Sequence, residues 1–126
     1  MNNRITLLGN PNCGKTAIFN LLTGLHQKVS NYPGTTVTTK KCEIDINGTL
    51  FDLFDLPGTY SVVPETIDEK IVTNHLLDIN NTNYNNIIIS IVDASNLSRN
   101  LYFSSQIAEF GVPVIIVLNM MDRVRK

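Results

Sequence analysis

The eight residues GNPNCGKT, Gly9 to Thr16, follow directly on an apolar run that ends at Leu8. A plain turn would explain the two glycines, but it would need neither Lys15 nor Thr16. The stretch fits the pattern GxxxxGK(S/T), in which backbone N–H groups and a helix N-terminus surround phosphate oxygens. We therefore expect a phosphate-binding loop, with Lys15 on the β and γ phosphates and the Thr16 hydroxyl on Mg²⁺. The alternative is a glycine turn that carries a surface lysine.

Apolar periodicity on both sides of this loop predicts alternating strands and helices. Strands are expected at 4–8, 39–46, 49–54, 87–92 and 114–118, and helices at 14–24, 65–78 and 98–110. Asn47-Gly48 favours a hairpin between the second and third strands, whereas the last two strands have the continuous apolar runs of parallel strands buried on both faces. Residues 26–40 lack such periodicity and are expected to form a long loop.

This order predicts an α/β layered fold with right-handed crossovers, a mostly parallel sheet and one antiparallel hairpin strand. Ligands of such folds lie beyond the carboxyl ends of the strands. Two further motifs are expected at those ends. DLPG, Asp55 to Gly58, would supply a carboxylate for Mg²⁺ and an amide for the γ-phosphate, although alone it is more often an ordinary turn.

NMMD, Asn119 to Asp122, follows the last predicted strand. Asp122 would accept hydrogen bonds from N1 and N2 of guanine, a donor pair that adenine lacks, while Asn119 holds the surrounding loop. In the loop NYPGTTV, Thr36 is a candidate second ligand of Mg²⁺ and Thr35 is its competitor. For either threonine the alternative is a β-branched residue that enters a strand.

Composition limits the class of protein. With 126 residues, 43% of them hydrophobic, and a net charge of -1, the chain is expected to form one globular domain that does not bind nucleic acid. Its apolar runs are shorter than the roughly 20 residues of a membrane-spanning helix, so we expect the fragment to be soluble. Cys13 is expected as a small side chain and not a nucleophile, Asp93 as a helix-entry residue, and His26 and His75 as surface or loop residues.

Together, the stretches GNPNCGKT, NYPGTT, DLPGTYS, VDASNLSRNLY and NMMD resemble the amino-terminal GTP-binding domain of the ferrous iron transport protein B (FeoB) family. NYPGTT and NLSRNLY are specific to this family, whereas the other motifs are shared with general GTPases. The resemblance implies a three-layer α/β fold of the P-loop GTPase type. The resemblance implies that GTP or GDP is bound by Gly9, Asn10, Pro11, Asn12, Cys13, Gly14, Lys15, Thr16, Ala17, Gly34, Thr35, Thr36, Asp55, Leu56, Pro57, Gly58, Asn119, Met120, Met121 and Asp122. It implies Mg²⁺ on Thr16, Thr36 and Asp55, and catalytic roles for Lys15, Thr36 and Asn12.

One residue departs from general GTPases. Thr59 follows Gly58, where Ras-like proteins place the glutamine that orients the attacking water, so slow intrinsic turnover is expected. In similar GTPases an asparagine at the position of Asn12 binds K⁺ against the phosphates, which implies activation by K⁺. The alternative is an amide that caps its own loop.

Full proteins of the family are transporters in the bacterial inner membrane, with this domain on the cytoplasmic face, followed by helical and transmembrane parts. A role in regulating ferrous iron uptake is therefore implied, and a homo-oligomer in the membrane is left open. The chain ends four residues after Asp122, so the GTP-binding domain, residues 1–126, is expected to lack its last strand and helices. Two alternatives are a ribosome- or RNA-associated assembly GTPase and a non-catalytic nucleotide-binding scaffold.

Overall fold

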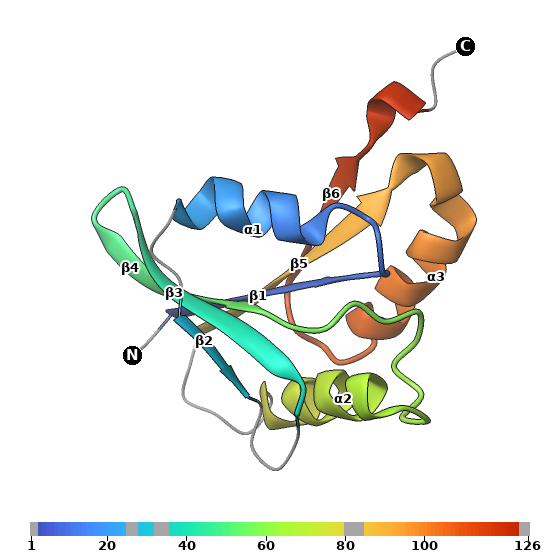
Figure 1. Cartoon of the computed structure of the whole chain (residues 1–126), viewed down its shortest axis with the longest axis horizontal. Coiled ribbons are helices and arrows are strands. Elements are labelled where there is room, and N and C mark those ends of the chain that lie inside the picture. Colours follow the sequence, from blue (N-terminus) through green and yellow to red (C-terminus); the bar gives the residue numbers. More distant parts are fainter. Residues whose placement is uncertain (1–2, 25–27, 32–35, 80–84, 124–126) are drawn as a thin grey trace.

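The structure, a computed structural model, describes residues 3–24, 28–31, 36–79 and 85–123 (Figure 1). Its strands are β1 (Asn3–Gly9), β2 (Lys28–Asn31), β3 (Thr38–Ile46), β4 (Thr49–Asp55), β5 (Asn85–Asp93) and β6 (Val114–Asn119). Its helices are α1 (Lys15–Thr23), α2 (Ile67–Ile79) and α3 (Leu97–Ala108), with short 3₁₀ turns η1 (Ala94–Asn96) and η2 (Met121–Arg123).

The strands form a six-stranded sheet in the order β2-β3-β4-β1-β5-β6. β1 is parallel to β4 and β5, β5 is parallel to β6, and β3 is antiparallel to β2 and β4. The mostly parallel sheet with an antiparallel hairpin is therefore confirmed. The turn Asn47-Gly48 has positive φ angles of 52° and 89°, as a two-residue hairpin requires.

One strand was not predicted. β2 lies inside the segment 26–40 that was expected to be a loop, and it pairs with the first half of β3. Its sequence KVSN carries a single apolar residue, Val29, whose side chain is 57% exposed. An edge strand that buries so little surface does not need alternating apolar and polar residues. Hydrophobic periodicity therefore does not predict it.

Helices cover both faces of the sheet (Figure 1). On one face Phe19 of α1 packs against Leu7 of β1 and Leu53 of β4. On the other face the buried side chains of α2 and α3 join those of β1 and β5, among them Leu8 and Phe103. Burying each such large side chain contributes roughly 1.5–3 kcal/mol to stability. This packing, with the parallel pairing of β1 and β4, holds the carboxyl ends of the two strands side by side.

His75 of α2 is buried, so its expected position at the surface is wrong. Its Nε2 lies 3.0 Å from the Thr6 hydroxyl, and its ring is tilted against Phe54. Burial, together with the nearby Arg4 cation, lowers the pKa of His75 to about 4, while Asp78 opposes this shift. The helical spacing from Ile71 already places this histidine on the apolar face of α2. His26 lies outside the described residues.

The last two strands differ from each other. β5 is a central strand whose second half is buried, as expected. In β6 the side chains of Ile115, Ile116 and Leu118 are about half exposed, so the expected burial of both faces is wrong for this strand. β6 is the edge of the sheet, and its outer side has no partner among the described residues. None of the described helices combines the length and the apolar character needed to cross a bilayer.

Candidate functional site

The segment Gly9 to Thr16 joins the end of β1 to the start of α1, as the motif predicts. The loop tightens where Cys13 N donates to the carbonyl oxygen of Asn10 at 3.3 Å. Asn12 and Gly14 adopt positive φ angles of 66° and 90°. These conformations turn the backbone toward the N-terminus of α1, where free N–H groups and the helix dipole favour an anion.

Close packing underneath the loop explains Gly9 and Cys13. A Cβ on Gly9 would lie 2.6 Å from the sulfur of Cys13 and 3.0 Å from the carbonyl oxygen of Ile91. The Cys13 side chain is 1% exposed, and burial raises the pKa of its thiol. A buried, neutral thiol is a packing group, in keeping with the expectation that Cys13 is not a nucleophile.

The ammonium of Lys15 forms an ion pair with Asp55 Oδ1 at the end of β4. Both residues are buried, with 9% and 6% of their surfaces exposed. The cation expected on the phosphates and the carboxylate expected on Mg²⁺ are therefore in direct contact. A buried pair of this kind keeps its charges only while each has a partner, because an unpaired buried charge is strongly destabilising.

The DLPG segment lies against the same loop. Thr59 N donates to the carbonyl oxygen of Gly9 at 3.1 Å, and a Cβ on Gly58 would lie 3.1 Å from the backbone of Pro11. A side chain at this position would push the two segments apart by a few tenths of an ångström. Thr59 Oγ1 and both side-chain polar atoms of Asn10 are buried without a hydrogen-bond partner in the described part of the chain.

The NMMD segment is bonded to the loop from its other side. Asn119 Nδ2 donates to the carbonyl oxygen of Cys13 at 3.0 Å, which matches the loop-holding role expected of Asn119. Met120 has a φ of 60°, and a Cβ on Gly14 would lie 3.1 Å from its Cε. Asp122 follows in η2 with an exposed side chain.

A cavity of about 450 Å³ opens over these elements, and its lining is Asn10, Pro11, Asn12, Gly14, Lys15, Thr16, Gly58 and Asp68. Asp122 and the exposed Thr36 lie outside the lining, as do Ala17, Leu56, Pro57 and Met121. Gly34 and Thr35 lie outside the described residues. Asp68, in the first turn of α2, was not predicted, because no motif surrounds it. A second cavity, of about 560 Å³, contains none of the predicted residues.

Comparison with known proteins identifies the family. The model of the family described as "Ferrous iron transport protein B" matches residues 3–126. The chain belongs to the FeoB family. The predicted resemblance is thereby confirmed.

Curated relatives include the Fe(2+) transporter FeoB of Legionella pneumophila (strain Lens), 44% identical over 92% of this chain. FeoB of Escherichia coli (strain K12) is 43% identical over 97% of the chain. The chain covers only 15% and 16% of these two FeoB proteins.

Solved structures show the same fold. The G domain of T. maritima FeoB superposes with a TM-score of 0.88 at 38% identity, covering 97% of this chain and 74% of that one. A mutant S. thermophilus NFeoB bound to mGDP gives a TM-score of 0.86 at 43% identity, covering 97% of this chain and 45% of that one. The P-loop GTPase-type architecture is therefore confirmed.

Gly14→Ala tests the contact between the phosphate loop and Asn119. Gly14 and Gly48 have φ angles of +90° and +89°, but a Cβ would lie 2.2 Å from Asn119 Nδ2 at Gly14 and would meet nothing within 4 Å at Gly48. Alanine in this backbone region costs about 1–2 kcal/mol at either position. Gly14→Ala should cost about 1 kcal/mol more in urea unfolding than Gly48→Ala, because it also displaces the Asn119 hydrogen bond. Equal costs would contradict the packing described here.

Proposed function

We propose that this chain is a switch domain that binds and hydrolyses GTP and thereby regulates ferrous iron uptake. The observation that carries the proposal is the Lys15–Asp55 ion pair beneath the phosphate loop. It brings together the two charged groups that a Mg²⁺-nucleotide needs, at the carboxyl ends of β1 and β4. The solved relatives bound to GDP and mGDP support a guanine nucleotide as the ligand.

Mg²⁺ fits the donors on this side of the loop. The Thr16 hydroxyl and the Asp55 carboxylate are hard oxygen ligands, which Mg²⁺ prefers, and Thr36 would add a second hydroxyl. When bound, the ion would offset the negative charge of the β and γ phosphates. Lys15 would move from Asp55 to these phosphates and the N-terminus of α1 would hold them while water displaces GDP from the γ-phosphorus.

Asn12 is the residue that we assign to K⁺. Its backbone has a φ of 66° at the tip of the phosphate loop, it lines the cavity, and its side chain is exposed. Among the described residues no hydrogen bond ties this side chain to the loop, which argues against the capping role. An amide oxygen is a hard, neutral ligand that suits a monovalent cation.

The proposed link between GTP hydrolysis and iron uptake is based on the curated relatives. Those curated as Fe(2+) transporters are about six times longer than this chain, so regulation of transport would need parts that lie outside it. We propose that the chain acts with helical and transmembrane parts of a longer protein at the cytoplasmic face of the bacterial inner membrane. Self-association there is a further proposal.

Nucleotide selectivity tests this function. GTP and GDP should displace a fluorescent guanine nucleotide about 10⁴-fold more effectively than ATP, because adenine would leave the Asp122 carboxylate without its donors. Asp122→Asn should shift the preference toward xanthosine nucleotides without lowering the melting temperature, since the Asp122 side chain is exposed. Equal displacement by ATP and GTP would contradict the assignment.

Monovalent ions test the role of Asn12. GTP hydrolysis should be faster in KCl than in NaCl at equal ionic strength, because K⁺ would offset charge that develops in the transition state. Asn12→Ala should remove this difference and leave GDP affinity nearly unchanged. Identical rates in the two salts would refute the K⁺ site, and no hydrolysis in either would favour the non-catalytic scaffold.

A further inference from the structure

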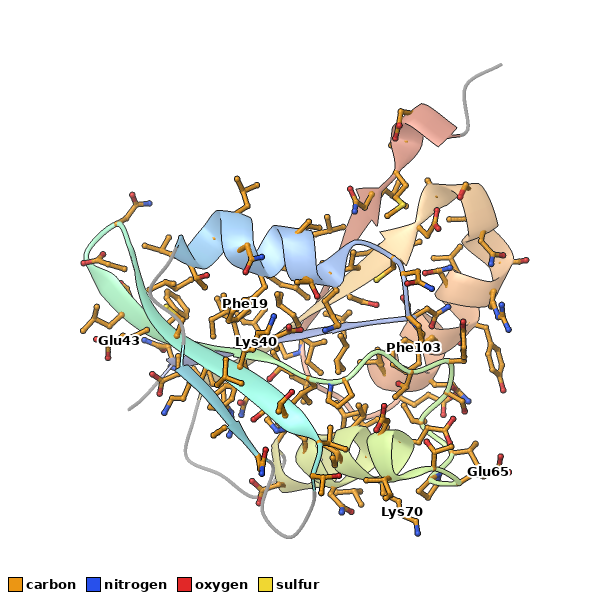
Figure 2. All side chains as sticks on the ribbon, viewed as in Figure 1. Phe19, Lys40, Glu43, Glu65, Lys70 and Phe103 are labelled. Atoms are coloured by element: carbon orange, nitrogen blue, oxygen red, sulfur yellow. The ribbon has the colours of Figure 1, made fainter. Side chains whose placement is uncertain are left out.

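Lys40 lies directly across the β3–β4 ladder from Asp55. Opposite residues of an antiparallel pair share a face of the sheet, with Cβ atoms about 4.5–5.5 Å apart. The face is that of α1, because Cys42 and Leu53, two positions along each strand, pack against Phe19. Figure 2 labels Lys40 on β3, beneath α1 in that view.

Lys15 approaches the same carboxylate from above. It is one helical turn from Phe19 on α1, so both side chains face the sheet, and its ammonium is paired with Asp55 Oδ1. Asp55 therefore has one cation bonded to it from the helix, and a lysine directly opposite it on the neighbouring strand. The Lys40 side chain is half-buried, and its ammonium forms no ion pair or hydrogen bond with the described residues.

Nucleotide binding would disturb this arrangement. On the proposed function, the phosphates draw Lys15 away from Asp55, which is only 6% exposed. A buried carboxylate that loses its cation is destabilised unless another cation replaces it. The candidate replacements are the Mg²⁺ of the nucleotide and the ammonium of Lys40, the residue directly opposite Asp55 in the ladder.

We propose that Lys40 is a positioning residue of the nucleotide site, which neutralises Asp55 when Lys15 moves to the phosphates and competes with Mg²⁺ for this carboxylate. The inference rests on the proposed function. Lys40 would thereby make GDP affinity less dependent on Mg²⁺. Without its charge, GDP binds poorly in the absence of Mg²⁺, and Mg²⁺ and GDP favour each other more strongly.

Lys40→Gln and Lys41→Gln form a matched pair of variants. Lys41 is the next residue on β3, faces the opposite side of the sheet and has its ammonium 5.4 Å from the centre of the Phe54 ring. The measurement is the Kd of a fluorescent GDP for the protein, once in Mg²⁺ and once in EDTA. The ratio of the two constants separates an effect on Asp55 from a general loss of structure.

Lys40→Gln should raise the EDTA-to-Mg²⁺ ratio of Kd at least about tenfold, the change expected when an opposite charge near a carboxylate is removed. Lys41→Gln and Lys40→Arg should keep the wild-type ratio, since the first charge lies on the other face and the second variant retains its charge. In a protein that already carries Asp55→Asn, Lys40→Gln should have no further effect on the ratio.

An unchanged ratio in Lys40→Gln, or an equal change in Lys41→Gln, would overturn the inference and leave the proposed function standing. Loss of GDP binding by Lys40→Gln in Mg²⁺ as well as in EDTA would also contradict it, because neutralisation of Asp55 predicts a defect confined to EDTA. Failure of the wild-type protein to bind GDP under both conditions would overturn the proposed function itself, and the inference with it.

Discussion

The buried ion pair between Lys15 and Asp55 is the interaction on which the rest of the site depends. It ties the first turn of α1 to the end of β4, and so fixes the phosphate loop over the sheet. The backbone contact from Thr59 to Gly9 and the side-chain contact from Asn119 to Cys13 then attach the other two motifs to that loop. Neither charge can be left unpaired in a buried site. Any ligand that draws the Lys15 ammonium away must therefore leave Asp55 with another cation.

Local sequence signals were sufficient for most of this arrangement. The phosphate loop, the Asn47-Gly48 hairpin and the helix entry at Asp93, whose side chain accepts from Ser95 N, are each set by a few neighbouring residues. β2 was missed because its one apolar residue is exposed. The spacing from Ile71 is enough to place His75 on the apolar face of α2, but its polar partner, Thr6, comes from another strand and cannot be read from the helix alone.

The parts of the site that were missed depend on pairing between distant segments. Asp68 lines the cavity only because α2 begins beside the phosphate loop. Lys40 carries no motif, but its position could be derived: the Asn47-Gly48 turn pairs Ile46 with Thr49, and counting outward along both strands pairs Lys40 with Asp55. The register of a predicted hairpin can thus identify site residues that belong to no sequence motif.

Binding of a nonhydrolysable GTP analogue with Mg²⁺ to Lys15→Ala, measured by calorimetry, tests the central claim most directly. A charge-assisted hydrogen bond contributes about 1.5–3 kcal/mol, so affinity should fall at least about tenfold relative to the unmutated protein. The fall should be larger still if Asp55 then repels the phosphates. An affinity equal to that of the unmutated protein would show that Lys15 does not bind the triphosphate and would contradict the account.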